Sequence, residues 1–156
     1  MERKFPHPKK ERIIFMTEFY KLFPEVPGQL GEKTQMDTTS DPPTVRYLHF
    51  IFDGWLGDDL IECFPCYLIT TTFLKRLLME NLSGFDIEAV EIGYSEVFKE
   101  LYPNRKLPEF KWLKINGQIG NDFFLRDKCL IVSKKVLKIF EENGNIRNCE
   151  IEKIVL

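Results

Sequence analysis

The sequence predicts an α+β fold in which two related β-β-β-α-β half-repeats share one core and the sheet is mostly antiparallel. The first observation is an internal repeat, because the stretch 47–75 recurs at 110–138 without a gap. The second is composition: the chain has 14 Phe and Ala89 as its only alanine, which favours strands over long helices. One half alone has too little core to be stable, so the two are expected to share one. The repeat pairs Gly54 with Gly117, Gly57 with Gly120, Asp59 with Asp122, Cys66 with Cys129 and Leu74 with Leu137.

The chain is predicted to be a single domain spanning residues 1–156, with the repeat at 45–92 and 108–155. A protein of 156 residues buries roughly two-thirds of its unfolded surface, which is enough for a hydrophobic core that needs no disulfides or structural metal ions. Before the repeat we expect an N-terminal strand or short helix in the Ile- and Phe-rich stretch 12–20, then a long loop to residue 44. Prolines and glycines fill 23–43, and a loop of that length inside a compact domain is a candidate contact surface.

Within the repeat, strands are predicted at 45–52 and 110–115, each running into a Gly-x-x-Gly turn. Returning strands begin at Asp59 and Asp122, which would give two hairpins. Strands at 67–69 and 130–132 then end at a hydroxyl residue. Thr70 and Ser133 are therefore expected to cap the helices that follow, by accepting a hydrogen bond from a free backbone N–H.

Apolar side chains at helical spacing predict helices after both caps, with stops at 81–84 and 143–144. Strands resume around 87–89 and 149–151. A short amphipathic helix is predicted at 95–102, where it links the two copies and ends before Pro103. The helix-spaced residues are Phe73, Leu74, Leu77 and Leu78 in the first copy, and Val136, Leu137 and Phe140 in the second.

Charge and hydropathy exclude several classes of function. The net charge is −2, so the basic footprint of a general nucleic-acid binder is missing. No apolar run approaches the roughly 18 residues that span a bilayer, and prolines at 6 and 8 interrupt any secretory signal. We therefore expect a soluble cytoplasmic protein with no nucleic-acid or membrane partner. The four cysteines are expected to be reduced thiols.

The pair Cys63 and Cys66 has the spacing of a dithiol redox motif or of half a zinc site. A redox pair needs its first cysteine at a helix N-terminus, and here a strand-like stretch separates the motif from the helix. Cys63 also aligns with Arg126 in the second copy. Structural thiols are the favoured interpretation, and no cofactor or metal is predicted.

Adjacent carboxylates at Asp58 and Asp59 resemble a metal-binding pair, but their repeat partners are Asn121 and Asp122. An Asp-to-Asn exchange preserves a turn or cap and removes charge that a magnesium site would need. Turn chemistry is therefore favoured.

Histidine is too scarce to support acid–base or nucleophilic catalysis. His49 aligns with Trp112, which favours a packing role, and no catalytic residue is predicted. Trp55 lies between two turn glycines and aligns with Gln118. It is either an exposed binding anchor or a ring tucked into the core.

The segment 112–124, followed by Cys129-Leu-Ile-Val-Ser and a helix, resembles the C-terminal half of immunity proteins from bacterial polymorphic toxin systems. Those proteins carry an aromatic-bearing strand, a Gly-x-Asp-Phe turn and a Leu/Ile-Val-Ser-helix signature. The resemblance covers mainly 108–140 and more faintly 60–90. It implies a small cytoplasmic α+β protein that binds and neutralises a cognate protein toxin, with no catalysis and no cofactor.

On this hypothesis the partner-binding candidates are Trp55, Asp58, Asp59 and the 23–43 loop. One alternative is a protein-binding accessory or regulatory module unrelated to toxins, which recognises its partner through an open strand edge. The other is a small enzyme that uses Cys63 and Cys66 or the Asp58–Asp59 pair.

Overall fold

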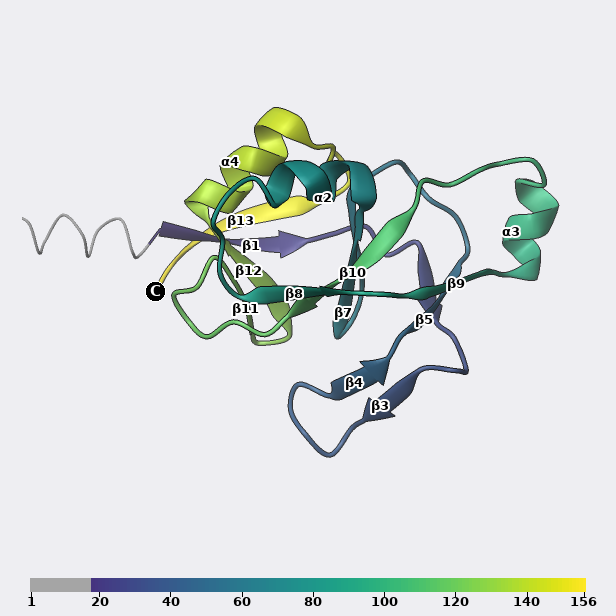
Figure 1. The fold of residues 1–156 in the computed structure, drawn as a ribbon, viewed down its shortest axis with the longest axis horizontal. Helices are drawn as coiled ribbons and strands as arrows, with labels where there is room; N and C mark the ends of the chain where they lie inside the picture. The colour runs from purple at the N-terminus through teal and green to yellow at the C-terminus, as the bar shows by residue number, and fades with distance from the viewer. Residues whose placement is uncertain (1–17) are drawn as a thin grey trace, which may run out of the picture.

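The computed structural model describes residues 18–156 and shows a mixed α+β architecture with mostly antiparallel sheets (Figure 1). Two of the helices in this part of the chain lie side by side across the sheets, and the third lies at the far end of the molecule (Figure 1). The pair is α2 (Thr71–Leu77) and α4 (Lys134–Asn143), and the distant helix is α3 (Glu96–Leu101). None of the described helices has the length and apolar character needed to cross a membrane.

Two four-stranded antiparallel sheets form the centre of the fold. The first has the order β6-β7-β10-β8 and the second β11-β12-β1-β13. The strands of the first are β6 (Leu60–Cys63), β7 (Cys66–Thr70), β10 (Phe110–Ile115) and β8 (Phe85–Glu88). Those of the second are β11 (Phe123–Arg126), β12 (Cys129–Ser133), β1 (Glu18–Phe23) and β13 (Glu150–Val155).

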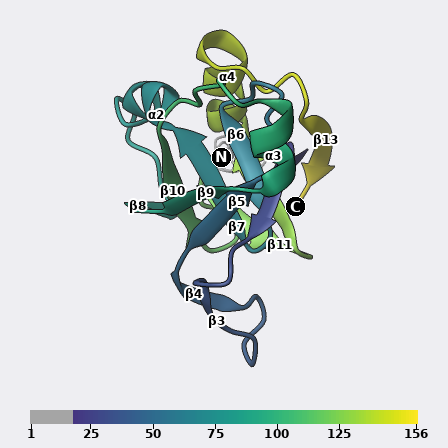
Figure 2. The ribbon, with the colours of Figure 1, turned by 90° about the vertical axis from the view of Figure 1, so that its right-hand side faces the viewer.

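Two smaller sheets are built from strands between residues 28 and 94. One has the order β2-β5-β9, and its β5–β9 pair is parallel. The other is the β3–β4 hairpin, which projects below the body of the molecule (Figures 1 and 2). Their bounds are β2 (Gly28–Leu30), β5 (His49–Phe52), β9 (Glu91–Tyr94), β3 (Gln35–Asp37) and β4 (Thr44–Tyr47).

The predicted long loop is therefore wrong in part, because 23–43 contributes β2 and β3 to these sheets. Short strands among prolines and glycines carry no period-two pattern, so composition alone hides them. Of the strand or helix predicted at 12–20, the structure describes the start of β1 at Glu18, and 12–17 lie outside the described residues.

The two predicted hairpins across the Gly-x-x-Gly turns are also wrong. β5 pairs with β2 and β9, while β10 pairs with β7 and β8. The hairpins are instead β6–β7 and β11–β12. Gly57 and Gly120 do turn the chain, with φ of 113° and 100°, but a turn fixes where the backbone bends and not which strand becomes its neighbour. Phe110, Trp112 and Leu113 are buried, so β10 gains more from a central position between two strands.

The main hydrophobic core lies under α2 and α4 and takes side chains from both four-stranded sheets. Leu60 and Leu113 come from the first sheet, and Leu22 and Phe123 from the second. A second cluster, which includes Phe50, Phe52, Leu68 and Trp112, packs on the opposite face of β7 and β10. Because both faces of β7 are covered, all five of its residues are buried. Where the helices meet, the rings of Phe73 and Phe140 stack with centroids 4.5 Å apart.

The predicted helix caps are confirmed. Thr70 and Ser133 accept hydrogen bonds from Phe73 N and Val136 N, and Ser95 caps α3 in the same way. The cap hydroxyls of α2 and α4 also donate to aspartates. Thr70 Oγ1 donates to Asp59 Oδ1 at 2.6 Å, and Ser133 Oγ donates to Asp122 Oδ1 at 2.8 Å.

The second oxygen of each aspartate binds the loop that follows the other helix. Asp59 Oδ2 accepts from Asn145 N at 2.7 Å, just beyond α4, and Asp122 Oδ2 accepts from Ser83 N at 2.9 Å, beyond α2. We call these two sets of contacts the aspartate bridges. They join each half of the chain to the helix–loop segment of the other.

We expect the Asp122→Ala substitution to lower the free energy of unfolding by about 1–3 kcal/mol, because it removes the charged acceptor of the Ser83 and Ser133 donors. Asp53→Ala is the control, since this exposed side chain makes no hydrogen bond among the described residues, and a change within about 0.5 kcal/mol is expected. Urea denaturation measures both. Equal stability of the two variants would contradict a structural role for the bridge.

Candidate binding surface

The predicted site residue Asp58 is fully buried. Its Oδ2 accepts from Asn148 N and its Oδ1 from Asn148 Nδ2, both at 2.9 Å. The carboxylate therefore anchors the loop after α4, and a partner reaches it only if that loop opens. Turn chemistry is confirmed for the repeat partner Asn121, whose Oδ1 accepts from Gln118 N at 2.7 Å. For Asp58 that interpretation is wrong, because the donor comes from a loop 90 residues away.

Asp59 is half-buried and both of its oxygens belong to the aspartate bridge with Thr70 and Asn145. Asp58 and Asp59 therefore both hydrogen-bond to the loop that follows α4, so their carboxylates make contacts within the protein. Together they fix the segment from which Trp55 and its neighbours extend.

Trp55 combines the two possibilities that the sequence left open. Its indole Nε1 donates to the Asp58 carbonyl oxygen at 2.9 Å, and its ring meets Phe110 edge-on with centroids 5.9 Å apart. The ring is nevertheless only half-buried. The Arg105 guanidinium lies 5.5 Å from the centroid of Trp55 and equally 5.5 Å from that of Tyr102, so a cation sits close to two aromatic rings.

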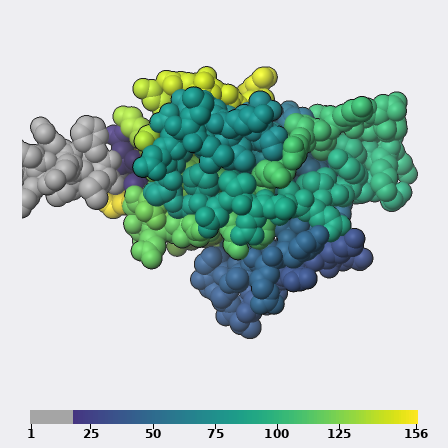
Figure 3. Space-filling model, in the orientation of Figure 1, coloured from purple at the N-terminus to yellow at the C-terminus, as the bar shows by residue number. Residues whose placement is uncertain are grey.

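Trp55, Tyr102 and Arg105 border an open groove of about 600 Å³. Tyr102 is the C-cap of α3, which lies at one end of the molecule (Figures 2 and 3). The walls of the groove come from the segments 24–28, 53–56 and 102–105 together with Asn148. Two apolar side chains of the rim are largely exposed, Val26 at 64% and Leu56 at 71%. We call this feature the Trp55 groove and define it by Glu25, Val26, Trp55, Leu56, Tyr102 and Arg105.

Glu25 is the buried acid of the groove and is only 7% exposed. Its Oε2 accepts from Leu56 N at 2.6 Å, whereas its Oε1 has no hydrogen-bond partner among the described residues. Burial raises the pKa of Glu25 and the Asp58 charge adds to that rise, while the backbone amides of Leu56 and Asp58 and the Arg105 charge oppose it.

The predicted contact segment 23–43 includes Glu25 without singling it out, and sequence reasoning missed Tyr102 and Arg105. The signal was present for Glu25, because a lone acid in the apolar stretch Pro24-Glu-Val-Pro27 has no solvated face to lie on. Tyr102 and Arg105 come next to Trp55 only through the tertiary fold, so no local pattern could have found them.

The cysteine pair lies where β6 and β7 turn, with Cys63 directly opposite Cys66. All four cysteines are free. Burial raises the pKa of Cys63, and it raises the pKa of Cys66 and of Cys149 to about 12. These three thiols are protonated near neutral pH, which disfavours a thiolate nucleophile and supports the structural interpretation.

His49 packs as predicted, with 9% exposure. Its Nδ1 accepts from Lys33 N at 3.3 Å. Gly31 approaches the ring so closely that an added Cβ would lie 2.2 Å from Nδ1. Within residues 18–156, no group of three or more His, Cys, Asp or Glu side chains converges as a metal site would require.

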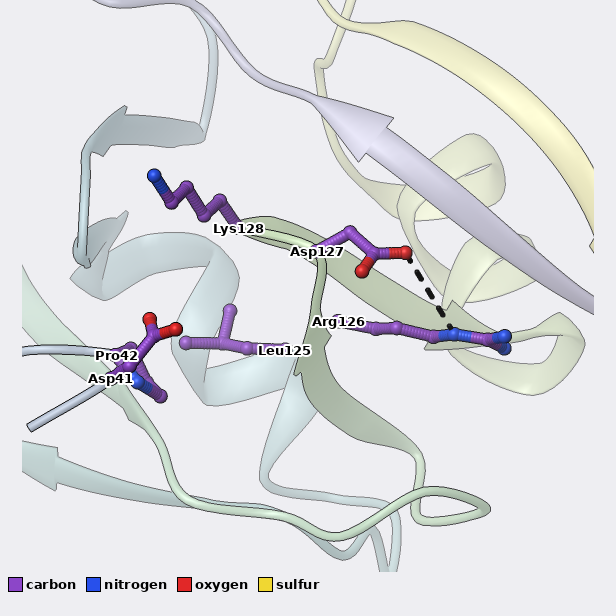
Figure 4. Close-up of a pocket in the computed structure, with 6 residues that line it drawn as sticks. All are labelled: Asp41, Pro42, Leu125, Arg126, Asp127 and Lys128. Atoms are coloured by element: carbon purple, nitrogen blue, oxygen red, sulfur yellow. Dashed lines mark ion pairs between the residues drawn. The ribbon is translucent and has the colours of Figure 1, made fainter.

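A second depression, of about 520 Å³, lies between the 41–42 turn and the β11–β12 turn. Leu125 points toward Pro42, while Arg126 points away beside Asp127, with Nε and Oδ2 4.0 Å apart (Figure 4). Of the residues that line it, none carries a buried polar atom without a partner. This depression offers less for recognition than the Trp55 groove.

Glu62 is a further acid that the sequence did not single out. It is half-buried on β6, directly opposite Tyr67 on β7, and burial raises its pKa to about 7. The Tyr67 hydroxyl is itself buried without a hydrogen-bond partner among the described residues.

Comparison with protein-family models, with curated proteins and with solved structures finds no match to this chain.

Glu62 makes stability depend on pH in a defined direction. Its folded pKa of about 7 lies above the ordinary value of 4.5, so the folded chain binds more protons between these values and stability falls as the pH rises through that window. We therefore expect Glu62→Gln to exceed the wild type by about 1–2 kcal/mol at pH 8, after allowance for solvent screening, and to match it near pH 4.

Denaturant unfolding at the two pH values measures this difference. Glu142→Gln, on the exposed face of α4, is the control and should show no comparable change with pH. A Glu62→Gln difference of the same size at pH 4 and pH 8 would rule out titration as the cause.

Proposed function

We propose that this chain is a non-enzymatic immunity protein that binds and neutralises a cognate bacterial toxin domain in the cytoplasm. The observation that carries the proposal is the Trp55 groove, where Trp55, Tyr102 and Arg105 meet at the surface. Trp, Tyr and Arg are the residues most enriched among the energetic hot spots of protein interfaces. Their contacts with one another hold these side chains in place before a partner arrives, which lowers the entropic cost of binding.

The rim of the groove supports a protein partner in particular. Val26 and Leu56 expose most of their side-chain surface beside the aromatic residues, at 64% and 71%. Apolar side chains around an aromatic centre exclude water from an interface and strengthen the contacts inside it. A toxin that presents a complementary surface would bury them.

The internal use of the catalytic candidates supports a non-enzymatic role. The carboxylate of Asp58 accepts hydrogen bonds from Asn148, and that of Asp59 accepts from Thr70 and Asn145. The thiols of Cys63 and Cys66 have raised pKa values. These groups hold the fold, and an enzyme would need them free for a substrate.

We also infer that residues 45–92 and 108–155 are related half-repeats within one domain. In support, the two aspartate bridges use equivalent positions. Both four-stranded sheets also have the same order across the sheet: the two strands of a hairpin, one further strand, and the strand that follows α2 or α4. The first strands of the two repeats differ, because β5 lies in the small β2-β5-β9 sheet while β10 lies in the first four-stranded sheet, at the place that β1 takes in the second. The support therefore comes from β6, β7, α2 and β8 in the first repeat and β11, β12, α4 and β13 in the second. On this account Trp55, where the other half has Gln118, marks the half that was specialised for a partner.

The alternative of a regulatory module unrelated to toxins has one observation in its favour. β13 pairs with β1 on one side only, so within the described chain it is an edge strand of six residues. Ile151 and Val155 on it are 40% and 74% exposed. An extended peptide could add to this edge by backbone hydrogen bonds.

The direct test is co-expression with the product of the adjacent gene. We expect the two proteins to copurify and this chain to restore growth. Tyr102→Ala and Leu56→Ala should each weaken the complex at least about ten-fold, because each removes side-chain contact at the groove. Isothermal titration calorimetry measures the affinities.

Ile119→Ala is a matched control, since Ile119 is 68% exposed in the Gly-x-x-Gly turn that corresponds to the one carrying Leu56. It should bind as the wild type does. Absence of a complex and of growth rescue would defeat the proposed function. A complex weakened by Ile119→Ala or by shortening of β13, with Tyr102→Ala and Leu56→Ala neutral, would move the interface elsewhere.

A further inference from the structure

We propose that the Trp55 groove receives a lysine or arginine side chain of the partner protein, and that Glu25 is the carboxylate that accepts its hydrogen bond. This inference rests on the proposed function and adds the chemistry of the contact. It concerns one acceptor atom, Glu25 Oε1, and one class of donor.

The first support is the state of the Glu25 side chain. More than nine-tenths of the residue is buried, Oε2 is bound by Leu56 N at 2.6 Å, and Oε1 has no partner among the described residues. A buried acceptor without a donor costs free energy, so a donor that reaches it is favoured. Because Glu25 lines the groove, the donor would come from there.

The second support is the balance of charge. Glu25 and Asp53 line the groove, and the buried Asp58 lies close enough to raise the pKa of Glu25. Arg105 is the single basic residue among the described residues of the lining, and it lies against the Trp55 and Tyr102 rings. The acids outnumber the base, which favours an incoming cation over an anion or a neutral amide.

The third support is the shape of a basic side chain. A lysine or arginine has an apolar stem and a charged tip. The exposed Val26 and Leu56 side chains form an apolar rim for the stem, and Glu25 lies deeper for the tip. Oε1 is out of reach of solvent, so the rim has to shift to admit the donor. Binding should then be sensed at the Leu56 amide, which donates to the other oxygen of the same carboxylate.

The experiment is an NMR titration of the full chain with two blocked tripeptides, Ac-Leu-Arg-Leu-NH2 and its citrulline counterpart Ac-Leu-Cit-Leu-NH2. Citrulline keeps the shape of arginine without its charge. We expect the arginine peptide to shift the Leu56 amide and the Trp55 indole signals saturably and to bind at least about ten-fold more tightly than the citrulline peptide. Glu25→Gln should remove that difference, and Glu142→Gln should preserve it.

Equal affinity for the two peptides, no saturable binding of the arginine peptide, or an unchanged preference in Glu25→Gln would each overturn the inference. The peptide comparison uses the wild-type chain, so it decides the matter even if Glu25→Gln fails to fold. A toxin complex that survives Glu25→Gln but is lost in Leu56→Ala would overturn this inference and keep the proposed function. Selective arginine binding at Glu25 without any toxin complex would overturn the proposed function and keep this inference.

Discussion

The aspartate bridges hold the two halves of the chain together through hydrogen bonds at the ends of α2 and α4. Asp59 and Asp122 each join the N-terminal cap of one helix to the loop after the other, so the two halves of the chain cannot separate without breaking these hydrogen bonds, three of which are partly buried. They also fix the ends of α2 and α4 over a shared core. Asp58 adds a further tie to the post-α4 loop through Asn148, and the neighbouring Trp55 is thereby held at the molecular surface.

One rule, that a buried carboxylate needs hydrogen-bond donors, separates structural acids from the one available for recognition. Asp58, Asp59 and Asp122 have both oxygens hydrogen-bonded, and each accepts at least one bond from a loop distant in the chain. Glu25 satisfies one oxygen only, and it does so at a groove bordered by aromatic side chains and Arg105. The acids that looked most functional in the sequence are the best satisfied ones, and the acid that remains incomplete lies in a segment expected to be a loop.

Local chemistry was predictable and long-range pairing was not. Thr70 and Ser133 were recognisable as caps because the cap bond spans only three residues. The α+β class was predicted from a composition that favours strands and from two segments, after Thr70 and Ser133, with apolar side chains at helical spacing. By contrast, the pairing of β10 with β7 and the tie from Asp58 to Asn148 join residues far apart in the chain, and turn glycines contain no information about them. The groove was missed for the same reason, since its walls meet only after folding.

Hydrogen–deuterium exchange of the chain with and without its copurified partner reports the bound surface without any substitution. If the partner binds the Trp55 groove, exchange in the complex slows at 24–28, 53–56 and 102–105, while the β13 edge and the β11–β12 turn stay unchanged. Slower exchange confined to β13 or to 125–128, with none at the Trp55 groove, would contradict binding at the groove.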